Sequence, residues 1–349
     1  MANGREILAR LLGTAKGCAI VHHLITTMPP KLNLIPPLSQ LPLNEGDPPH
    51  SAWGLWEGHD SSLGSLNYLT DELVLKTLRE EVRTGVRIGL DLPLDFFNPP
   101  LLGRAGFEQK VIDKAPLVVN DDIITFNTQG SSQWDSLRHF AYQKDQKFYN
   151  GATQQDIHAA PRTSVNDLQG WTAKGLAGRG VLIDYAAYAA REKIAIDHFS
   201  PHGITVDVVK AIADESKIEF QSGDVLFLRT GYVDAYRQLS KDRRIEVAGV
   251  REWCGLAQSR ETTEWLWERQ FAAVACDAPG FEVRPPNNKV WHLHPILLAG
   301  WGTPIGELFA LDALADACRA QGKFSFFFTS APLNYSGAVA SPPNAVAIL

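Results

Sequence analysis

Apolar positions along this chain are spaced in two ways, one typical of helices and the other typical of strands. Helical spacing begins at about Thr70, ends near Gly85, and predicts one apolar face that holds Leu73, Val74, Leu78 and Val82. Residues 86–95 alternate as a strand. Further along, apolar strands are predicted in GRGVLIDYAAYA, GDVLFLRTG and FAAVACDAPGFE, and a helix is predicted in HGITVDVVKAIADESKI.

These elements mix without a strict strand–helix–strand repeat, which predicts a mixed α+β domain over residues 53–349. Residues 1–27 are expected to form an amphipathic helix. Residues 28–50 are rich in proline, which sustains neither a helix nor a central strand. Residues 1–52 are therefore predicted to be an N-terminal helix followed by a proline-rich arm.

Composition narrows the classes of protein to consider. The 349 residues are 45% hydrophobic and 21% charged, with a net charge of -6, which is ordinary for a globular protein. No cluster of Lys or Arg predicts binding to nucleic acid or to a membrane surface. The four cysteines lie far apart and form no CxxC pair, which argues against disulfides and structural zinc and favours a cytoplasmic protein.

The segment NTQGSSQWDSLRHFAYQ, residues 127–143, concentrates polar groups that can carry chemistry. If it turns from a strand into a helix, Gln133 and Asp135 share a strand face and His139 follows one turn later. A carboxylate beside an imidazole fixes its tautomer and raises its basicity, so Asp135 and His139 are a candidate acid–base pair. The alternative is that Asp135 caps a helix and His139 is a surface side chain.

Three other segments carry candidate site residues. WHLHPILLAGWGTPIGEL holds His292, His294, Trp301 and Glu307, although Glu307 could instead be a charge at a helix N-terminus. Asp277 and Glu282, after a predicted buried strand, either line a pocket or shape a Pro-Gly turn. Arg229 could bind a substrate carboxylate through its planar fork, or it could pair with an internal acid.

Taken in order, these segments resemble the cyclase / kynurenine formamidase-like superfamily, and in particular a fungal branch with a proline-rich N-terminal extension. The matching pieces cover about 290 residues and are LGSLNYLT, QGSSQWDSLRHF, GRGVLIDYA, GDVLFLRTG, VACDAPGFE and HPILLAGWGTPIGELFALDAL. The resemblance implies a swivelling β/β/α fold, a small-molecule substrate and a homodimer or homotetramer.

The signature of that superfamily reads H-x-G-T-H-x-D-x-P-x-H. Asp135 and His139 match its aspartate and last histidine, whereas Gln129 and Gln133 stand where its two early histidines would bind metal. Ser131 and Ser132 replace the Gly-Thr pair, and Leu137 replaces the proline. The resemblance assigns His139 as the general acid/base and His294 and Glu307 as the distal metal ligands, with His292 as a possible substitute for His294.

Glutamine offers an amide oxygen, a much weaker ligand for zinc than imidazole nitrogen. The expectation is therefore a site without a metal, with Mn²⁺ or Zn²⁺ held by Asp135, His294 and Glu307 as the alternative. The predicted catalytic residues are His139, Asp135, Glu307 and His294, and the predicted substrate-binding residues are Gln129, Gln133, Trp134, Arg138, Trp301 and Arg229.

Such a site suits acid–base cyclisation, dehydration or isomerisation of a carbonyl compound of aromatic or polyketide type, as in secondary metabolism. The alternatives are metal-dependent hydrolysis of an amide, lactone or imide, and a ligand-binding homologue without catalysis.

Overall fold

The computed structural model describes residues 35–349, so the helix predicted over residues 1–27 lies outside the described residues. The α-helices are α3 (Asp71–Glu81), α4 (Gln154–Ile157), α5 (Gln169–Lys174), α6 (Tyr185–Arg191), α7 (Val206–Glu215), α8 (Tyr232–Arg237), α9 (Lys241–Ala248), α10 (Arg260–Arg269), α11 (Leu293–Pro295) and α12 (Asp312–Gln321). The strands are β1 (Arg87–Gly89), β2 (Glu108–Asp113), β3 (Asn120–Thr125), β4 (Gln133–Asp135), β5 (Leu176–Asp184), β6 (His202–Ile204), β7 (Val225–Arg229), β8 (Cys254–Leu256), β9 (Ala273–Cys276), β10 (Ile305–Glu307), β11 (Ser325–Ser330), β12 (Ala340–Ser341) and β13 (Ala345–Ile348).

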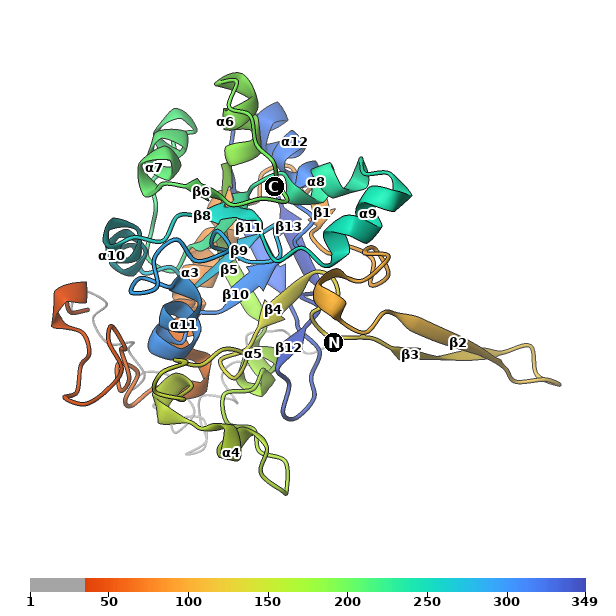
Figure 1. The fold of residues 1–349 in the computed structure, drawn as a ribbon, viewed down its shortest axis with the longest axis horizontal. Coiled ribbons are helices and arrows are strands. Elements are labelled where there is room, and N and C mark those ends of the chain that lie inside the picture. Colours follow the sequence, from red (N-terminus) through yellow and green to blue (C-terminus); the bar gives the residue numbers. More distant parts are fainter. Residues whose placement is uncertain (1–34) are drawn as a thin grey trace, which may run out of the picture. The chain divides into compact units, whose positions relative to one another are not determined.

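Nine strands form one mixed sheet in the order β1-β13-β11-β5-β7-β9-β10-β4-β12 (Figure 1). The four central strands β5, β7, β9 and β10 run parallel, and the strands on either side are antiparallel. The apolar runs predicted as strands became β5, β7 and β9, whose side chains are buried almost throughout. The prediction of a mixed α+β fold is confirmed.

An aromatic cluster fills one side of the sheet. Phe227 of β7 lies 5.1 Å from Phe328 and 5.6 Å from Phe326, both of β11, measured between ring centroids. Phe326 lies opposite Gly180 of β5, where a Cβ atom would come within 2.2 Å of its ring. A side chain at position 180 would therefore clash with the core, which explains the glycine that interrupts this apolar strand.

Helix α3 begins after Thr70, whose side chain accepts a hydrogen bond from the Leu73 backbone, and Leu73, Val74 and Val82 of the predicted apolar face are half-buried. Leu78 is 45% exposed, whereas Glu81 is buried. Glu81 accepts hydrogen bonds from Arg179 of β5 and from Ser325 of β11. Burial acts to raise the pKa of Glu81, but these contacts and Lys323 hold it below its usual value. A polar cluster around Glu81 therefore holds α3 on the sheet in addition to its half-buried apolar side chains.

The chain divides into two units, residues 1–36 and residues 37–349, and the second is compact. Leu38 and Leu41 are buried in the second unit, and the His50 carbonyl accepts a hydrogen bond from the Trp301 indole. Residues 37–52 fall in this second unit, and the predicted domain boundary between residues 52 and 53 stays a prediction. Part of the proline-rich segment belongs to the folded body because its leucines complete the core.

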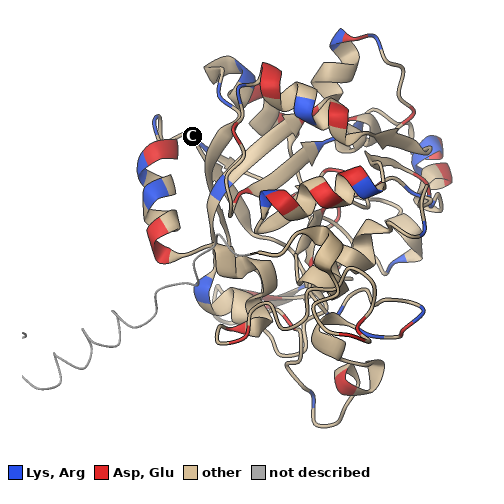
Figure 2. Cartoon of the chain, turned by 90° about the vertical axis from the view of Figure 1, so that its left-hand side faces the viewer, with Lys and Arg blue, Asp and Glu red and all other residues tan. Residues whose placement is uncertain are grey.

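The surface carries both signs of charge interspersed along the helices (Figure 2). Strands β2 and β3 pair as a hairpin that projects away from the main sheet (Figure 1). Near its tip, Leu117, Val118 and Val119 are exposed. Among the helices of residues 35–349, none combines the length and the apolar character needed to cross a membrane.

Candidate active site

Strand β4 carries the first part of the site into the sheet between β10 and β12. Its three residues are buried, and side chains alternate between the two faces of a strand. Gln133 and Asp135 therefore share one face, as predicted, and Trp134 lies on the other. Gln133 pairs in register with Glu307 of β10, which brings these two side chains together across 174 positions of sequence. The helix predicted after Asp135 is absent, because the chain makes a turn in which the His139 amide donates to the Ser136 carbonyl.

Four of the predicted catalytic groups converge at this point. The Nε2 atom of His294 lies 3.7 Å from Asp135 Oδ2 and 3.7 Å from Glu307 Oε1. The Nε2 atom of His139 lies 3.8 Å from the same oxygen of Asp135. His294 is supplied by α11, directly before the π-helix Ile296–Trp301. The structure thus brings together two imidazoles and two carboxyl groups from three separate segments.

Both predicted glutamines belong to the same cluster, and both act as hydrogen-bond donors. The amide nitrogen of Gln129 donates to Asp135 Oδ1 at 2.7 Å and lies 3.2 Å from His139 Nδ1. The amide nitrogen of Gln133 donates to Glu307 Oε2 at 2.6 Å. Each carboxyl group is therefore held by one amide, which fixes its orientation.

Glu282 is a site residue for which the sequence indicated only that it could line a pocket or shape a turn. Its carboxylate lies 3.1 Å from His294 Nδ1 and 3.3 Å from His292 Nε2. This contact orients the His294 ring and leaves its Nε2 atom directed at Asp135 and Glu307. The sequence signal that could have identified Glu282 is its position in DAPGFE, directly after a predicted buried strand.

Burial and neighbouring charges push the pKa values of the cluster apart. Burial and the adjacent Asp135 carboxylate raise the pKa of Glu307 well above its usual value. Burial lowers the pKa of His139, against the opposing effect of Asp135. Burial acts to lower the pKa of His294, but Glu282, Asp135 and Glu307 together raise it well above 6.5. For Asp135, burial is outweighed by His139 and His294, which hold its pKa below the usual value.

A cavity of about 290 Å³ opens onto this cluster and is called the central cavity below. The residues that line it include Arg104, His139, Phe140, Glu282, His294 and Glu307. A neighbouring cavity of about 780 Å³ shares His139 and Phe140 with it. Asp135 is fully buried behind the central cavity. The side chain of Arg104 donates to the Gln129 carbonyl. The sequence did not indicate Arg104 as a site residue, because nothing in the neighbouring residues distinguishes it.

Two tryptophans predicted to bind substrate lie elsewhere. The Trp134 indole is buried on the opposite face of β4, where it donates to Ser330 Oγ and packs against Phe309. Trp301 packs against Trp267 and contributes to a different cavity. Trp134 points away from the central cavity because it alternates with Gln133 and Asp135 along β4. The structure therefore brings neither Trp134 nor Trp301 to the central cavity.

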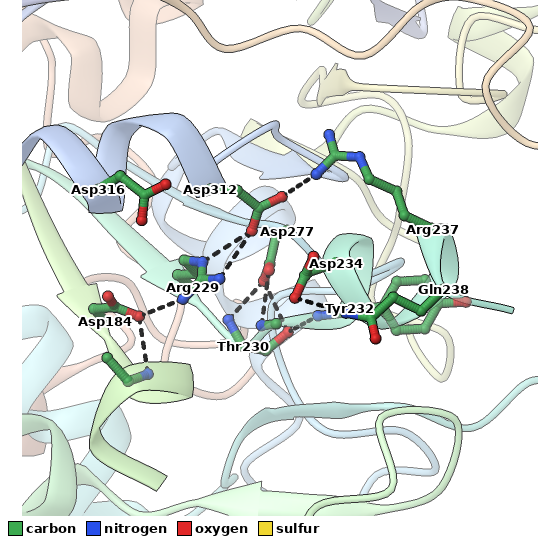
Figure 3. Close-up of polar contacts among 12 residues, drawn as sticks. Asp184, Arg229, Thr230, Tyr232, Asp234, Arg237, Gln238, Asp277, Asp312 and Asp316 are labelled. Atoms are coloured by element: carbon green, nitrogen blue, oxygen red, sulfur yellow. Dashed lines mark hydrogen bonds and ion pairs between the residues drawn. The ribbon is translucent and has the colours of Figure 1, made fainter. Parts of the chain in front are cut away.

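The two predicted arginines are also placed outside the central cavity. The Nε atom of Arg138 donates to the Val165 carbonyl at 2.9 Å. Arg229 donates hydrogen bonds to Asp184 at 2.8 Å and to Asp312 at 3.0 Å, so its guanidinium group is paired with internal acids (Figure 3). Asp277 accepts hydrogen bonds from the backbone amides of Thr230 and Gly231 and shapes a turn (Figure 3).

The donor atoms at the centre also fit a divalent cation. Asp135, His139 and His294 each offer one ligand atom, and these atoms lie within 4.8 Å of one another. Asp135 Oδ2 and Gln133 Oε1 are buried without a hydrogen-bond partner among residues 35–349. Ligands bound at about 2.1 Å lie several ångströms apart, which is comparable to the 3.7 Å between His294 Nε2 and its two carboxyl neighbours.

A mixed α+β fold with buried carboxyl and imidazole groups around a cavity is an arrangement typical of enzymes. The chain belongs to the Cyclase family, because the family model described as "Putative cyclase" matches residues 60–283.

Solved structures share the fold. The crystal structure of a novel cyclase aligns with a TM-score of 0.75 and 27% identity, covering 86% of this chain and 99% of that one. Isatin hydrolase A from Labrenzia aggregata, bound to benzyl benzoate, aligns with a TM-score of 0.52 and 15% identity over 79% of this chain and 97% of its own. An isatin hydrolase bound to the product analogue thioisatinate aligns with a TM-score of 0.53 and 15% identity over 80% and 96%. No match was found among curated proteins.

Proposed function

We propose that this chain is an enzyme that catalyses ring closure, dehydration or isomerisation of a carbonyl-containing aromatic or polyketide-like metabolite by acid–base chemistry without a metal. His139 is the general base and Glu307 is the general acid. Asp135 stays ionised beside His139, and His294 holds the two carboxyl groups in place. Membership in the Cyclase family supports the enzymatic function.

One observation carries the proposal: a histidine and a carboxyl group face the same cavity in environments that favour opposite protonation states. His139 and Glu307 both line the central cavity. A lowered pKa favours the neutral imidazole, which accepts a proton, and a raised pKa favours the protonated carboxyl group, which donates one. The Gln133 amide donates a hydrogen bond to Glu307 Oε2, so the other oxygen, Oε1, is the one that carries the proton.

The chemistry follows from these two roles. A nucleophilic N–H or O–H of the substrate loses its proton to His139 while the nucleophile bonds to the carbonyl carbon. Glu307 delivers its proton to the carbonyl oxygen, so that a ring hydroxyl forms. In the dehydration that follows, protonated His139 gives its proton to the leaving hydroxyl. Glu307 takes a proton from the ring, and water departs with both groups restored.

The glutamines support this reading over a metal site. Relative to the signature of the resembling superfamily, Gln129 and Gln133 stand in place of two metal-binding histidines. Their amide nitrogens are directed at Asp135 and Glu307, the carboxyl groups that a cation would otherwise neutralise. Hydrogen bonds from neutral amides stabilise both oxygens without a metal charge.

The pH dependence of kcat/KM tests the assignment, with isatin ring opening and isatinate ring closure as the first reactions to assay. Activity should fall as the pH drops through the lowered pKa of His139, because the base becomes protonated. It should fall again as the pH rises through the raised pKa of the Asp135–Glu307 pair, because the acid is lost. In Glu307→Gln the alkaline limb should vanish, with kcat reduced about 100-fold or more.

The exposed variant Glu57→Gln is the matched control and should keep both limbs. An alkaline limb that persists unchanged in Glu307→Gln would rule out Glu307 as the acid. Binding of ligands without turnover in any reaction of this class would identify a binding homologue.

A second candidate function is metal-assisted hydrolysis of an amide, lactone or imide, and the unpartnered oxygens of Asp135 and Gln133 favour it. Asp135, His294 and Glu307 would hold the cation, with Gln133 Oε1 as a weaker ligand. A bound cation would supply a Lewis acid that polarises the carbonyl. His139 would still hold or move the proton of the attacking group.

Metal analysis of the purified protein separates the two candidates. We expect far less than one equivalent of Mn, Zn or Fe per chain and unchanged activity after EDTA treatment. The double variant Gln129→His/Gln133→His supplies a positive control, because two added imidazoles should create measurable Zn²⁺ binding. Stoichiometric metal in the wild-type protein, lost together with activity in EDTA, would establish hydrolysis by a metal enzyme instead.

A further inference from the structure

We propose that the substrate of this site is an aromatic compound carrying a carboxylate, which Arg251 and Arg284 bind beside the ring of Trp253. The inference rests on the function proposed above, because it concerns the same central cavity. It adds the substrate class, which neither the fold nor the acid–base groups specify.

Backbone pairing places these three residues together. The Trp253 amide donates to the Arg284 carbonyl at 3.1 Å, and the Arg284 amide donates to the Trp253 carbonyl at 3.2 Å. This antiparallel bridge makes Trp253 and Arg284 direct cross-strand neighbours, whose side chains lie on one face. Arg251 precedes Trp253 by two positions, and all three residues line the central cavity. Two arginines and one tryptophan therefore line the central cavity from neighbouring backbone positions.

The guanidinium groups of Arg251 and Arg284 have no ion pair or hydrogen bond within residues 35–349. Other arginines of this protein differ: Arg179 is bound by Glu81 and Asp224, and Arg229 by two aspartates. Arginines free of internal acids remain available for a planar, two-pronged contact with a carboxylate.

The balance of charge in the central cavity also favours an anion. Three arginines line it, Arg104 with Arg251 and Arg284, against two acids. Both acids are engaged from within the protein, Glu282 by two histidines and Glu307 by Gln133. The cavity is therefore a local positive site in a chain whose net charge is -6, which concentrates anionic ligands there.

The aromatic part of the ligand is inferred from the walls. The Trp253 indole donates to the Glu282 carbonyl at 3.0 Å and lies so close to Gly280 that a Cβ atom there would come within 2.7 Å of its Nε1. Phe140 forms another part of the wall, 5.1 Å from His294 between ring centroids. At about 290 Å³, the cavity is at the lower end of ligand-pocket sizes, which suits a compound of one or two rings.

Binding of benzoate and of its neutral analogue benzamide tests the proposal without any turnover. Calorimetry or ligand-observed NMR on the wild-type protein should show benzoate bound at least about tenfold more tightly than benzamide. Arg251→Gln and Arg284→Gln should each weaken benzoate about tenfold and leave benzamide unchanged, as loss of one charged contact predicts. Arg251→Lys should restore part of the affinity because the charge returns without the planar fork.

The control is Arg83→Gln, an exposed arginine outside the central cavity, which should bind both compounds as the wild type does. Equal affinity for benzoate and benzamide would overturn the substrate class, and persistent isatin turnover in that case would leave the acid–base function standing. Conversely, arginine-dependent benzoate binding in a protein that turns over none of the assayed compounds would support the anion site while refuting the proposed catalysis.

Discussion

Replacing His139 with alanine is expected to lower kcat for ring closure by about 10²- to 10⁴-fold, the usual contribution of a general base. His139 is the imidazole that both lines the central cavity and has a pKa lowered by burial, so its loss leaves no neutral base at this wall. The measurement is kcat and KM for isatinate closure near neutral pH. Because His139 is assigned to proton transfer and not to substrate binding, KM should change much less than kcat.

The matched control is His59→Ala, which removes an exposed imidazole remote from the central cavity. Circular dichroism and the urea midpoint should show that both variants remain folded. If His139→Ala retained full kcat, another group would have to accept the proton, and His139 would be a structural side chain.

The variant Glu282→Ala is expected to lower the free energy of unfolding by about 3–5 kcal/mol, because it removes the carboxylate that contacts Nδ1 of the buried, positively charged His294. Glu282 accepts from both His292 and His294. Glu282→Gln should therefore lower the free energy of unfolding less than Glu282→Ala does, because glutamine keeps the size of the side chain and one acceptor oxygen. Urea denaturation monitored by fluorescence measures the change.

The pH dependence of that difference has a definite sign. The pKa of Glu282 is lowered in the folded state, so its contribution is fully present above its unfolded value of 4.5 and declines as the pH falls below it. The pKa of His294 is raised, so its contribution is fully present below 6.5 and is lost as the pH rises through the raised value. The difference between wild type and Glu282→Ala should be greatest between pH 4.5 and 6.5, and it should decline as the pH rises from 6.5 through the raised pKa of His294. A difference no larger than that of exposed Glu57→Ala across this window would refute the buried ion pair.

Glu282 also illustrates why a positioning residue escapes a search for catalytic motifs. Its carboxylate contacts His292 and His294, and its backbone carbonyl accepts from the Trp253 indole. One residue thus joins the imidazole of His294 to the aromatic wall of the central cavity. The role depends on three segments that meet only in the folded chain, so the sequence could indicate an acid at a strand end and nothing more.

Local patterns were sufficient where the relevant forces are local. Apolar runs identified β5, β7 and β9, because strands buried on both faces have apolar residues at most positions. Alternation along a strand placed Gln133 and Asp135 on one face. The same rule implies that Trp134 faces the core, so this misplacement was avoidable from sequence. The capping Thr70 likewise marked the start of α3 correctly.

The sequence by itself therefore determined the mixed fold, the main strands and the chemical character of Asp135, His139, His294 and Glu307. The tertiary structure alone decided how these groups meet. The register of β4 on β10 joins Gln133 to Glu307, and the path after β9 brings Glu282 to His294. It also decided that Arg229 is bound by Asp184 and Asp312, whereas the guanidinium groups of Arg251 and Arg284 have no such partner within residues 35–349. The physical reason is that strand register and ion pairing depend on which distant segments the sheet places side by side, and residue spacing along the chain does not encode that choice.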